Sequence, residues 1–363
     1  SEYQAAVLRA GVREFWICVC GPLLDFGLLN GGKIKKYLGQ LSLLCQIVVL
    51  MPALLAAQAK PIRDITVSYP IGGSTSYFWV AHRSGSFEKY GLRLRAVHIS
   101  GSVAAIQSLL ARELFIQFEG GPAGVRAWAR GAKDVTVIGA VGNKLDYLLV
   151  SIPSIKKPED LKGKRIGVSA IGASSDFIAR HAVRQLGLNP EKDVSILASG
   201  AMGLRWAAIS GGNLEATVVQ PPFTLLARKA GLTIHLDLSK QEFQYPISAV
   251  LTTRSFIKSE NETVMNFMRG LADGMDFYRD EANKEKVYQY LGEYYRSKAR
   301  EEFEETRRVY SQMTPGLPLI TVKSIENLIV NDKELAPMGL KPSEILDLSF
   351  LDRLQEERKS RAR

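Results

Sequence analysis

The chain has 363 residues, of which 46% are apolar and 23% are charged, and its formal net charge is +10. This composition excludes an intrinsically disordered chain, and the length suffices for two compact domains. The basic excess is spread along the chain instead of forming a stripe with interleaved aromatic residues, so we expect no nucleic-acid partner.

The N-terminal segment has the layout of a secretory leader. Its positive region contains Lys33, Lys35 and Lys36. Residues 41–55 are nearly all apolar, and a small-residue cleavage motif ends at Ala59. We therefore predict a signal peptide over residues 33–59, with cleavage after Ala59 and a mature protein in the periplasm or on the extracellular face. The alternative is an uncleaved membrane anchor, because the apolar stretch approaches spanning length. We assign no function to residues 1–32.

All cysteines of the chain precede Lys60; they are Cys18, Cys20 and Cys45. In the rest of the chain this excludes a disulfide framework, a thiolate nucleophile and a cysteine-ligated metal. A cysteine-free chain suits an oxidising compartment.

From residue 64 onward, short apolar runs alternate with helical patterns. In the first part of the chain we predict strands over residues 65–70, 92–99, 114–118, 135–141 and 147–152. Residues 77–83 and the spacing of Val103, Ile106 and Leu110 predict helices between the strands. Strands that alternate with helices indicate βαβ units on a mainly parallel sheet.

A second unit repeats this alternation. Its predicted strands cover residues 164–169, 193–197, 215–222 and 232–238, and residues 249–253 resume a sheet. Helices are predicted after the first of these strands, ending at Gly187, and over residues 204–210. After residue 255 the pattern is helical, and we expect this tail to pack on the first unit.

Three turns share one design. The stretches "IGGSTSY", "EGGPAG" and "IGASSDF" each join the end of a predicted strand to the start of a helix. Glycines allow close approach of the backbone, and free N–H groups with Ser and Thr hydroxyls can bind a ligand there. In open α/β sheets, ligands bind at this end of the strands. A single turn could be ordinary helix capping, but two turns from different units that face each other predict a shared ligand.

The sequence offers few groups for catalysis. Its histidines are His82, His98, His181 and His235. No two of them have the spacing of a zinc site on a helix, and we interpret His181 as a surface residue and not as a catalytic base. The chain contains neither a G-x-S-x-G elbow nor a G-x-x-x-x-G-K-[ST] loop. We therefore expect no enzyme activity, no cofactor and no metal.

Several stretches resemble the substrate-binding proteins of ABC importers that handle nitrate, sulfonate, taurine and thiamine-pyrimidine-type solutes. The most specific is "PEDLKGKRIGV", followed by a Gly/Ser turn and "ARHAVRQLGLNP"; "SYFWVAHRSGSFEKYGLRLRAVHISG" and "AAISGGNLEATVVQPP" are also similar to that family. The resemblance covers about residues 65–253. It implies an α/β, two-lobed, periplasmic-binding-protein-like (type II) fold with extra C-terminal helices. Lobe one would comprise residues 60–151 and 246–363, and lobe two would comprise residues 152–245.

The resemblance also implies a ligand site between the lobes. The implied residues of lobe one are Gly73, Ser74, Thr75, Gly101, Ser102, Gly120 and Gly121. Those of lobe two are Gly172, Ala173, Ser174, Ser175, Gln220 and Pro221, and the implied stacking groups are Tyr77, Trp79 and Tyr245. Two features depart from an anion site. Asp176 would repel an anion if it faced the cleft, and no arginine lies inside the three turns.

The expected function is that of a secreted, monomeric solute-binding component of an ABC transporter. It would capture a small organic solute between its lobes and deliver the solute to a membrane permease. The alternatives on the same fold are a pyrimidine-precursor synthase-like enzyme and a sensor module that presents its ligand to a receptor. The fungal pyrimidine-precursor synthases use a cysteine-rich motif, which the chain after Lys60 lacks.

Overall fold

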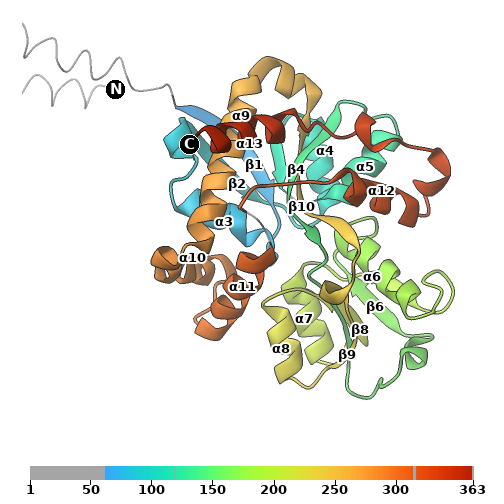
Figure 1. Ribbon diagram of the computed structural model, residues 1–363. Coiled ribbons are helices and arrows are strands. Elements are labelled where there is room, and N and C mark those ends of the chain that lie inside the picture. Colours follow the sequence, from blue (N-terminus) through green and yellow to red (C-terminus); the bar gives the residue numbers. More distant parts are fainter. Residues whose placement is uncertain (1–61, 119, 314–315, 362–363) are drawn as a thin grey trace, which may run out of the picture. The chain divides into compact units, whose positions relative to one another are not determined.

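The computed structural model describes residues 62–118, 120–313 and 316–361. The predicted signal peptide and residues 1–32 lie outside the described residues. From Ile62 onward the chain forms one compact unit. It is built around two five-stranded sheets, each accompanied by helices (Figure 1).

The first sheet is parallel except for one strand. In spatial order its strands are β2 (Leu92–His98), β1 (Arg63–Tyr69), β3 (Ile116–Phe118), β10 (Gln244–Thr253) and β4 (Val135–Lys144). β1 pairs in parallel with β2 and β3, whereas β10 runs antiparallel to both β3 and β4.

The second sheet repeats this plan. Its strands, in spatial order, are β7 (Ser195–Ala198), β6 (Arg165–Val168), β8 (Ala216–Val219), β5 (Leu148–Ser151) and β9 (Thr233–Asp237). β6 pairs in parallel with β7 and β8, and β5 is the antiparallel strand.

The sequence pattern of each strand follows its place in the sheet. β4 reads VTVIGAVGNK, and its first eight residues are buried, because helices or neighbouring segments cover both faces. β2 lies at the edge and reads LRLRAVH, in which buried Leu92 and Leu94 alternate with exposed Arg93 and Arg95.

Two crossovers connect the sheets. The first, residues 145–147, leads from β4 into β5, and the second leads from β9 through the 3₁₀ turn η4 (Leu238–Lys240) into β10. Each crossover thus enters the antiparallel strand of the other sheet. We call the segments that build the first sheet, with the C-terminal helices, the first lobe, and residues 148–237 the second lobe. The boundary predicted after residue 151 differs from this pairing, because β5 bonds to β8 and β9 and not to a strand of the first lobe.

A helix follows most of the parallel strands at their carboxyl ends. These helices are α3 (Ser76–Arg83), α4 (Ser102–Leu110) and α5 (Gly121–Ala129) in the first lobe, and α6 (Ser174–Gln185), α7 (Met202–Ser210) and α8 (Phe223–Lys229) in the second. The remaining 3₁₀ turns are η2 (Glu88–Tyr90), η3 (Pro158–Leu161), η5 (Glu281–Asn283), η6 (Ala336–Met338) and η7 (Pro342–Glu344).

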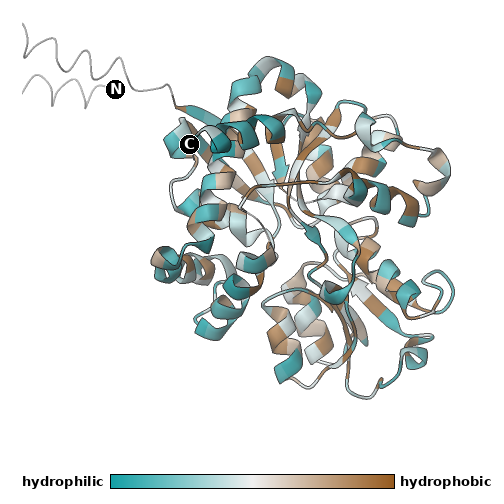
Figure 2. Cartoon of the chain, in the orientation of Figure 1, coloured by the Kyte–Doolittle hydropathy of each residue, from teal (hydrophilic) through white to brown (hydrophobic). Residues whose placement is uncertain are grey.

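The C-terminal helices cover mainly the first lobe, as predicted. They are α9 (Arg254–Arg279), α10 (Lys284–Tyr295), α11 (Arg300–Met313), α12 (Val322–Asn331) and α13 (Ser349–Arg361). α9 and α10 pack on α3, α12 packs on β10, and α11 contacts both α9 and α8 of the second lobe. Hydrophilic residues are frequent along α10, α11 and α13 (Figure 2). None of the described helices combines the length and the apolar character that crossing a bilayer requires.

The contact between α9 and α3 depends on one glycine. A Cβ atom at Gly274 would lie 2.1 Å from the Cβ atom of Ala81 and 2.6 Å from its Cα atom. The backbone of α3 cannot yield locally, so we expect Gly274→Ala to lower the free energy of unfolding by about 1–3 kcal/mol in urea titrations. The control is Gly203→Ala, where a Cβ atom would meet nothing within 4 Å. Equal midpoints for the two variants would contradict the close packing.

Candidate functional site

A pocket lies between the two lobes, at the carboxyl ends of their parallel strands. The first lobe lines it with Ser68, Tyr69, Pro70, Ile71, Gly72, His98, Ile99, Ser100, Gly101, Ser102, Ala105, Gln117 and Phe118. The first crossover contributes Tyr147, and the second lobe contributes Ser169, Ala173, Ser174, Ser175, Ala201, Met202, Arg205 and Gln220. The space open to water-sized molecules is about 50 Å³, whereas a single water needs roughly 10–15 Å³. The pocket therefore suits a few waters or one small solute.

Three helices begin at this pocket. α4 starts after Gly101, α6 after Ala173 and α7 after Ala201, and none of the three has a side chain that caps its first N–H groups. Uncapped N–H groups and the positive end of the helix dipole attract anions. Because α4 belongs to the first lobe and α6 and α7 to the second, an anion here would contact both lobes.

A buried arginine adds a positive charge to the same wall. Arg205, in the first turn of α7, is only 2% exposed and lines the pocket. Its Nη1 atom donates to Oγ1 of Thr217 at 2.8 Å and to the carbonyl oxygen of Val218 at 2.7 Å, and its Nε atom donates to the carbonyl oxygen of Gly200 at 3.2 Å. These bonds fix the guanidinium group in position beside the pocket.

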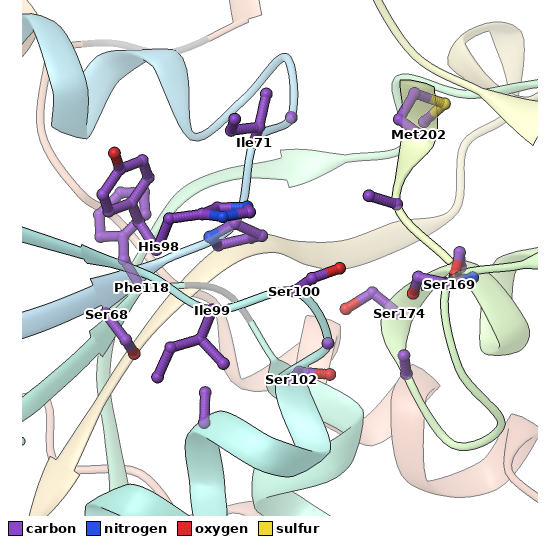
Figure 3. Close-up of a pocket in the computed structure, with 18 of the residues that line it drawn as sticks. Ser68, Ile71, His98, Ile99, Ser100, Ser102, Phe118, Ser169, Ser174 and Met202 are labelled. Carbon is purple, nitrogen blue, oxygen red and sulfur yellow. Dashed lines mark hydrogen bonds between the residues drawn. The ribbon is translucent and has the colours of Figure 1, made fainter. Parts of the chain in front are cut away.

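Serine hydroxyls converge on the pocket from both lobes. Ser100 and Ser174 point toward one another across it, and Ser102 lies beside them (Figure 3). The hydroxyl groups of Ser68 and Ser102 are buried and have no hydrogen-bond partner among the described residues. Since buried polar groups are usually hydrogen-bonded, these two hydroxyls are suited to a bound solute.

The structure brings six of the predicted site residues to this pocket. They are Gly101, Ser102, Ala173, Ser174, Ser175 and Gln220. Ser175 also supports the turn, because its hydroxyl accepts a 2.8 Å bond from the N–H of Ser169.

The first glycine turn differs from the prediction, because its later residues serve the fold. Pro70, Ile71 and Gly72 line the pocket, but Gly73, Ser74 and Thr75 are not among the lining residues. The hydroxyl of Ser74 bonds to that of Ser248 at 2.6 Å. Thr75 is fully buried, and its hydroxyl bonds to the Tyr294 hydroxyl at 2.5 Å.

The predicted stacking groups belong to the core. Tyr77 is fully buried, with its ring centroid 4.3 Å from that of Tyr278. Trp79 donates from Nε1 to the carbonyl oxygen of Tyr290. Tyr245 is 1% exposed and stacks on Phe177.

The remaining predicted residues lie around the pocket without lining it. Gly120 is close to Gln117 and Ser102, so that a Cβ atom there would lie 2.5 Å from Nε2 of Gln117. Gly121 packs near Pro246, and Pro221 lies near Gly73.

Beside the pocket, a separate groove between the lobes accommodates Gly172 and Asp176. Asp176 is buried there and accepts bonds from the N–H of Gly172 and from Arg180. It is not among the residues that line the pocket, and its negative charge is paired with Arg180 at 2.8 Å.

His181 is not the surface residue that we predicted. It is 2% exposed, and its ring lies between Phe177 and Phe243. Burial lowers its pKa, so the neutral ring is favoured. No group of three or more His, Cys, Asp and Glu side chains in the described part of the chain is arranged to hold a metal ion.

Sequence reasoning missed Arg205 and the α7 turn. The stretch "ASGAMGLRW" follows β7 and has the same strand–turn–helix form as the three turns that were recognised. The glycine at position 200 was the sequence signal that could have revealed this turn, and in the structure it adopts a φ of 80°. An arginine in a helical pattern is usually interpreted as a solvent-exposed charge, so the sequence alone did not mark Arg205 as a site residue.

Comparisons with known proteins agree with this architecture. Residues 74–284 match the model of the family described as "NMT1/THI5 like". A structure of a protein from Bordetella bronchiseptica RB50 is 16% identical, with a TM-score of 0.72, and the match covers 82% of this chain and 98% of that chain. The alkanesulfonate-binding protein SsuA from Xanthomonas axonopodis pv. citri, bound to MOPS, is 16% identical, with a TM-score of 0.65 and coverage of 79% and 97%.

An enzyme structure is similar as well. A DszB mutant in complex with biphenyl-2-sulfinic acid is 14% identical, with a TM-score of 0.58 and coverage of 82% of this chain and 100% of that chain. No curated protein matches the sequence. The structural matches confirm the predicted two-lobed periplasmic-binding-protein fold.

Proposed function

The chain belongs to the NMT1/THI5-like family, and on this premise we propose that it is a solute-binding protein that captures a small organic anion between its lobes. The observation that carries the proposal is the convergence of three uncapped helix N-termini and buried Arg205 on one pocket. Hydrogen-bond donors from both lobes and a positive charge from the second lobe favour a closed state around an anion.

The anion is small and carries oxygen acceptors. The pocket offers serine hydroxyls and backbone N–H groups beside an apolar wall that includes Ile71, Phe118 and Met202. A sulfonate, a nitrate-like ion or a short carboxylate fits this chemistry, and the sulfonate-binding relative points in the same direction.

The family match supports a role in delivering the solute to a partner. We propose that the protein is a monomer on the outer side of the membrane, placed there by its signal peptide, and that it passes the solute to the permease of an ABC importer. A ligand-presenting sensor module would use the same pocket, so the partner that binds the closed form distinguishes transport from sensing.

Binding without conversion distinguishes the proposal from an enzyme on the same fold. The DszB relative shows that this fold occurs in a protein complexed with a sulfinic acid. We expect the solute to be recovered unchanged after incubation with the protein. A product found by mass spectrometry would replace the binding proposal with an enzymatic one.

Thermal-shift screening of the full chain tests the ligand class. Sulfonates, nitrate, carboxylates, neutral pyrimidines and amines should be compared. We expect at least one anion to stabilise the protein, because a ligand at a hundredfold excess over its Kd adds about 2.7 kcal/mol. Stabilisation by amines or neutral pyrimidines alone would contradict an anion site.

A charge placed in the pocket should abolish binding without harming the fold. In Ser174→Asp the new carboxylate would lie in the first turn of α6, where the helix dipole stabilises it by about 0.3–1 kcal/mol. It would also repel an anion, so we expect an unchanged or slightly higher melting temperature and no stabilisation by the anion. The matched control is Ser349→Asp at the start of α13, which should bind normally. Retained affinity in Ser174→Asp would exclude this pocket as the site.

A further inference from the structure

The first glycine turn is also a point where the second lobe contacts the first. The backbone N–H of Gly73 donates to Oε1 of Gln220 at 2.7 Å. Gln220 follows β8 of the second lobe, is 4% exposed and lines the pocket. The bond therefore connects the lobes directly beside the proposed solute.

The glycine pair permits this approach. A Cβ atom at Gly72 would lie 2.5 Å from Oε1 of Gln220, and one at Gly73 would lie 2.4 Å from the carbonyl oxygen of Pro221. The atom near Gly72 is the end of a flexible side chain and can shift, whereas the atom near Gly73 belongs to the backbone of the second lobe. A larger residue at Gly73 would therefore push the second lobe away. The "GG" of this turn thus has a role in lobe contact.

A buried carboxyl group holds the other end of the Gln220 amide. Nε2 of Gln220 donates to Oδ2 of Asp146 at 3.2 Å, and the Tyr310 hydroxyl donates to the same oxygen at 2.5 Å. Asp146 lies in the first crossover and Tyr310 lies on α11. A chain of bonds therefore runs from α11 through the crossover and the second lobe to the glycine turn.

The surroundings of Asp146 favour its neutral form. It is 3% exposed, its Oδ1 atom has no partner among the described residues, and it forms no ion pair with a described Lys, Arg or His. The groups that face it are the Tyr310 and Tyr295 hydroxyl-bearing rings of the C-terminal helices and the Gln220 amide. Burial raises the pKa of Asp146 to about 7.

We propose that Asp146 and Tyr310 are positioning residues for lobe closure: they hold the Gln220 amide against the Gly72–Gly73 turn in a buried site where no described residue supplies a cation, and ionisation of Asp146 favours the open form, in which water can reach the carboxylate. The inference deepens the proposed solute-binding function and rests on it. Separation of the lobes would remove Gln220 and admit water to the crossover, which stabilises a carboxylate. Closure and solute affinity should therefore fall as the pH rises through the titration of Asp146.

Interlobe distances measured by fluorescence energy transfer test this inference. The labels are placed on Arg95→Cys in the first lobe and Lys192→Cys in the second, which are both exposed, in the full chain with its native cysteines replaced by serine. Distances are recorded at about pH 5.5 and about pH 8.5, without solute and with methanesulfonate as the probe. We expect the closed-to-open ratio to fall about tenfold at the higher pH, as a pKa difference of one unit between the two forms would give.

We call the contact of Asp146 and Tyr310 with Gln220, and of Gln220 with Gly73, the latch. Variants distinguish its pH response from the titration of other groups. Asp146→Asn should keep the same ratio at both pH values, and Gly73→Ala should stay open at both. Asp352→Asn, an exposed carboxylate on α13, should follow the wild type. A pH-independent wild type, or an Asp146→Asn variant with the wild-type response, would overturn the latch.

The same interlobe distances distinguish a failure of the latch from a failure of the proposed anion binding. If methanesulfonate and the other anions fail to close the lobes while the unliganded protein still responds to pH through Asp146, the anion function fails and the latch stands. If anions close the wild type and Asp146→Asn equally at every pH, the latch fails and the anion function stands.

Discussion

Replacing Arg205 by glutamine is expected to weaken the binding of the anionic solute about a hundredfold. A hydrogen bond to a charged group contributes about 1.5–3 kcal/mol, and Arg205 lines the pocket as a buried cation held by Thr217, Val218 and Gly200. Lysine would not substitute, because it lacks the planar fork of donors that these acceptors fix. Isothermal titration calorimetry with the anion found by thermal-shift screening measures the loss.

The control for Arg205→Gln is Arg165→Gln on the same lobe. Arg165 is half exposed and pairs with Glu215 at 2.6 Å, away from the pocket. Its replacement should change neither the affinity nor, beyond about 1 kcal/mol, the stability. Arg205→Gln should in addition lose about 1–3 kcal/mol of stability, because carbonyl oxygens are left unbonded. If a folded Arg205→Gln protein bound the anion with wild-type affinity, the positive charge of Arg205 would have no part in binding.

The stability of the protein should fall between pH 4 and pH 7 because of Asp146. Its pKa is raised from 3.8 to about 7 by burial, against the opposing hydrogen bonds from Tyr310 and Gln220. Within this window the folded protein binds one proton more than the unfolded chain, so the free energy of unfolding decreases as the pH rises. Above pH 7 the carboxyl group is ionised in both states and the loss is complete, at about 4 kcal/mol.

Asp146→Asn isolates this contribution from the other titrating groups. Asparagine resembles the neutral carboxyl group, so the variant should match the wild type near pH 4 and exceed it by a few kcal/mol near pH 8. His82, His181 and His235 have pKa values lowered by burial, which gives the opposite slope in both proteins and cancels in the difference. Guanidinium unfolding of both proteins across this range provides the measurement. A constant difference would show that Asp146 titrates normally.

The fold class could be predicted because the alternation of apolar runs and helical stripes is local. The boundaries of the strands were harder to predict from the sequence. β10 begins at Gln244, five residues before the predicted start at 249, because Pro246 normally argues against a central strand. The pairing of β10 with β4 shifts register between Gln244 and Ile247, which accommodates the proline. The partner of β5 could not be predicted either, since a strand does not encode its neighbours.

The candidate site was predictable to the level of turns but not of side chains. Parallel strands present their carboxyl ends at one edge, so the turns after them were expected to converge. Which residue of each turn reaches the pocket depends on distant partners: Ser248 binds Ser74, and Tyr294 binds Thr75. Arg205 is buried only because β8 supplies Thr217 and Val218 as acceptors, and no pattern near residue 205 reveals that.

The two crossovers have a consequence for biosynthesis. The ends of the second lobe are adjacent, since the N–H of Leu238 donates to the carbonyl oxygen of Tyr147 at 3.0 Å. All strands of that sheet have been synthesised once residue 237 has been made, whereas the first sheet lacks β10, between β3 and β4, until residue 253. On a nascent chain, the inserted lobe should therefore mature before the segment that precedes it, the reverse of ordinary N-terminal-first order.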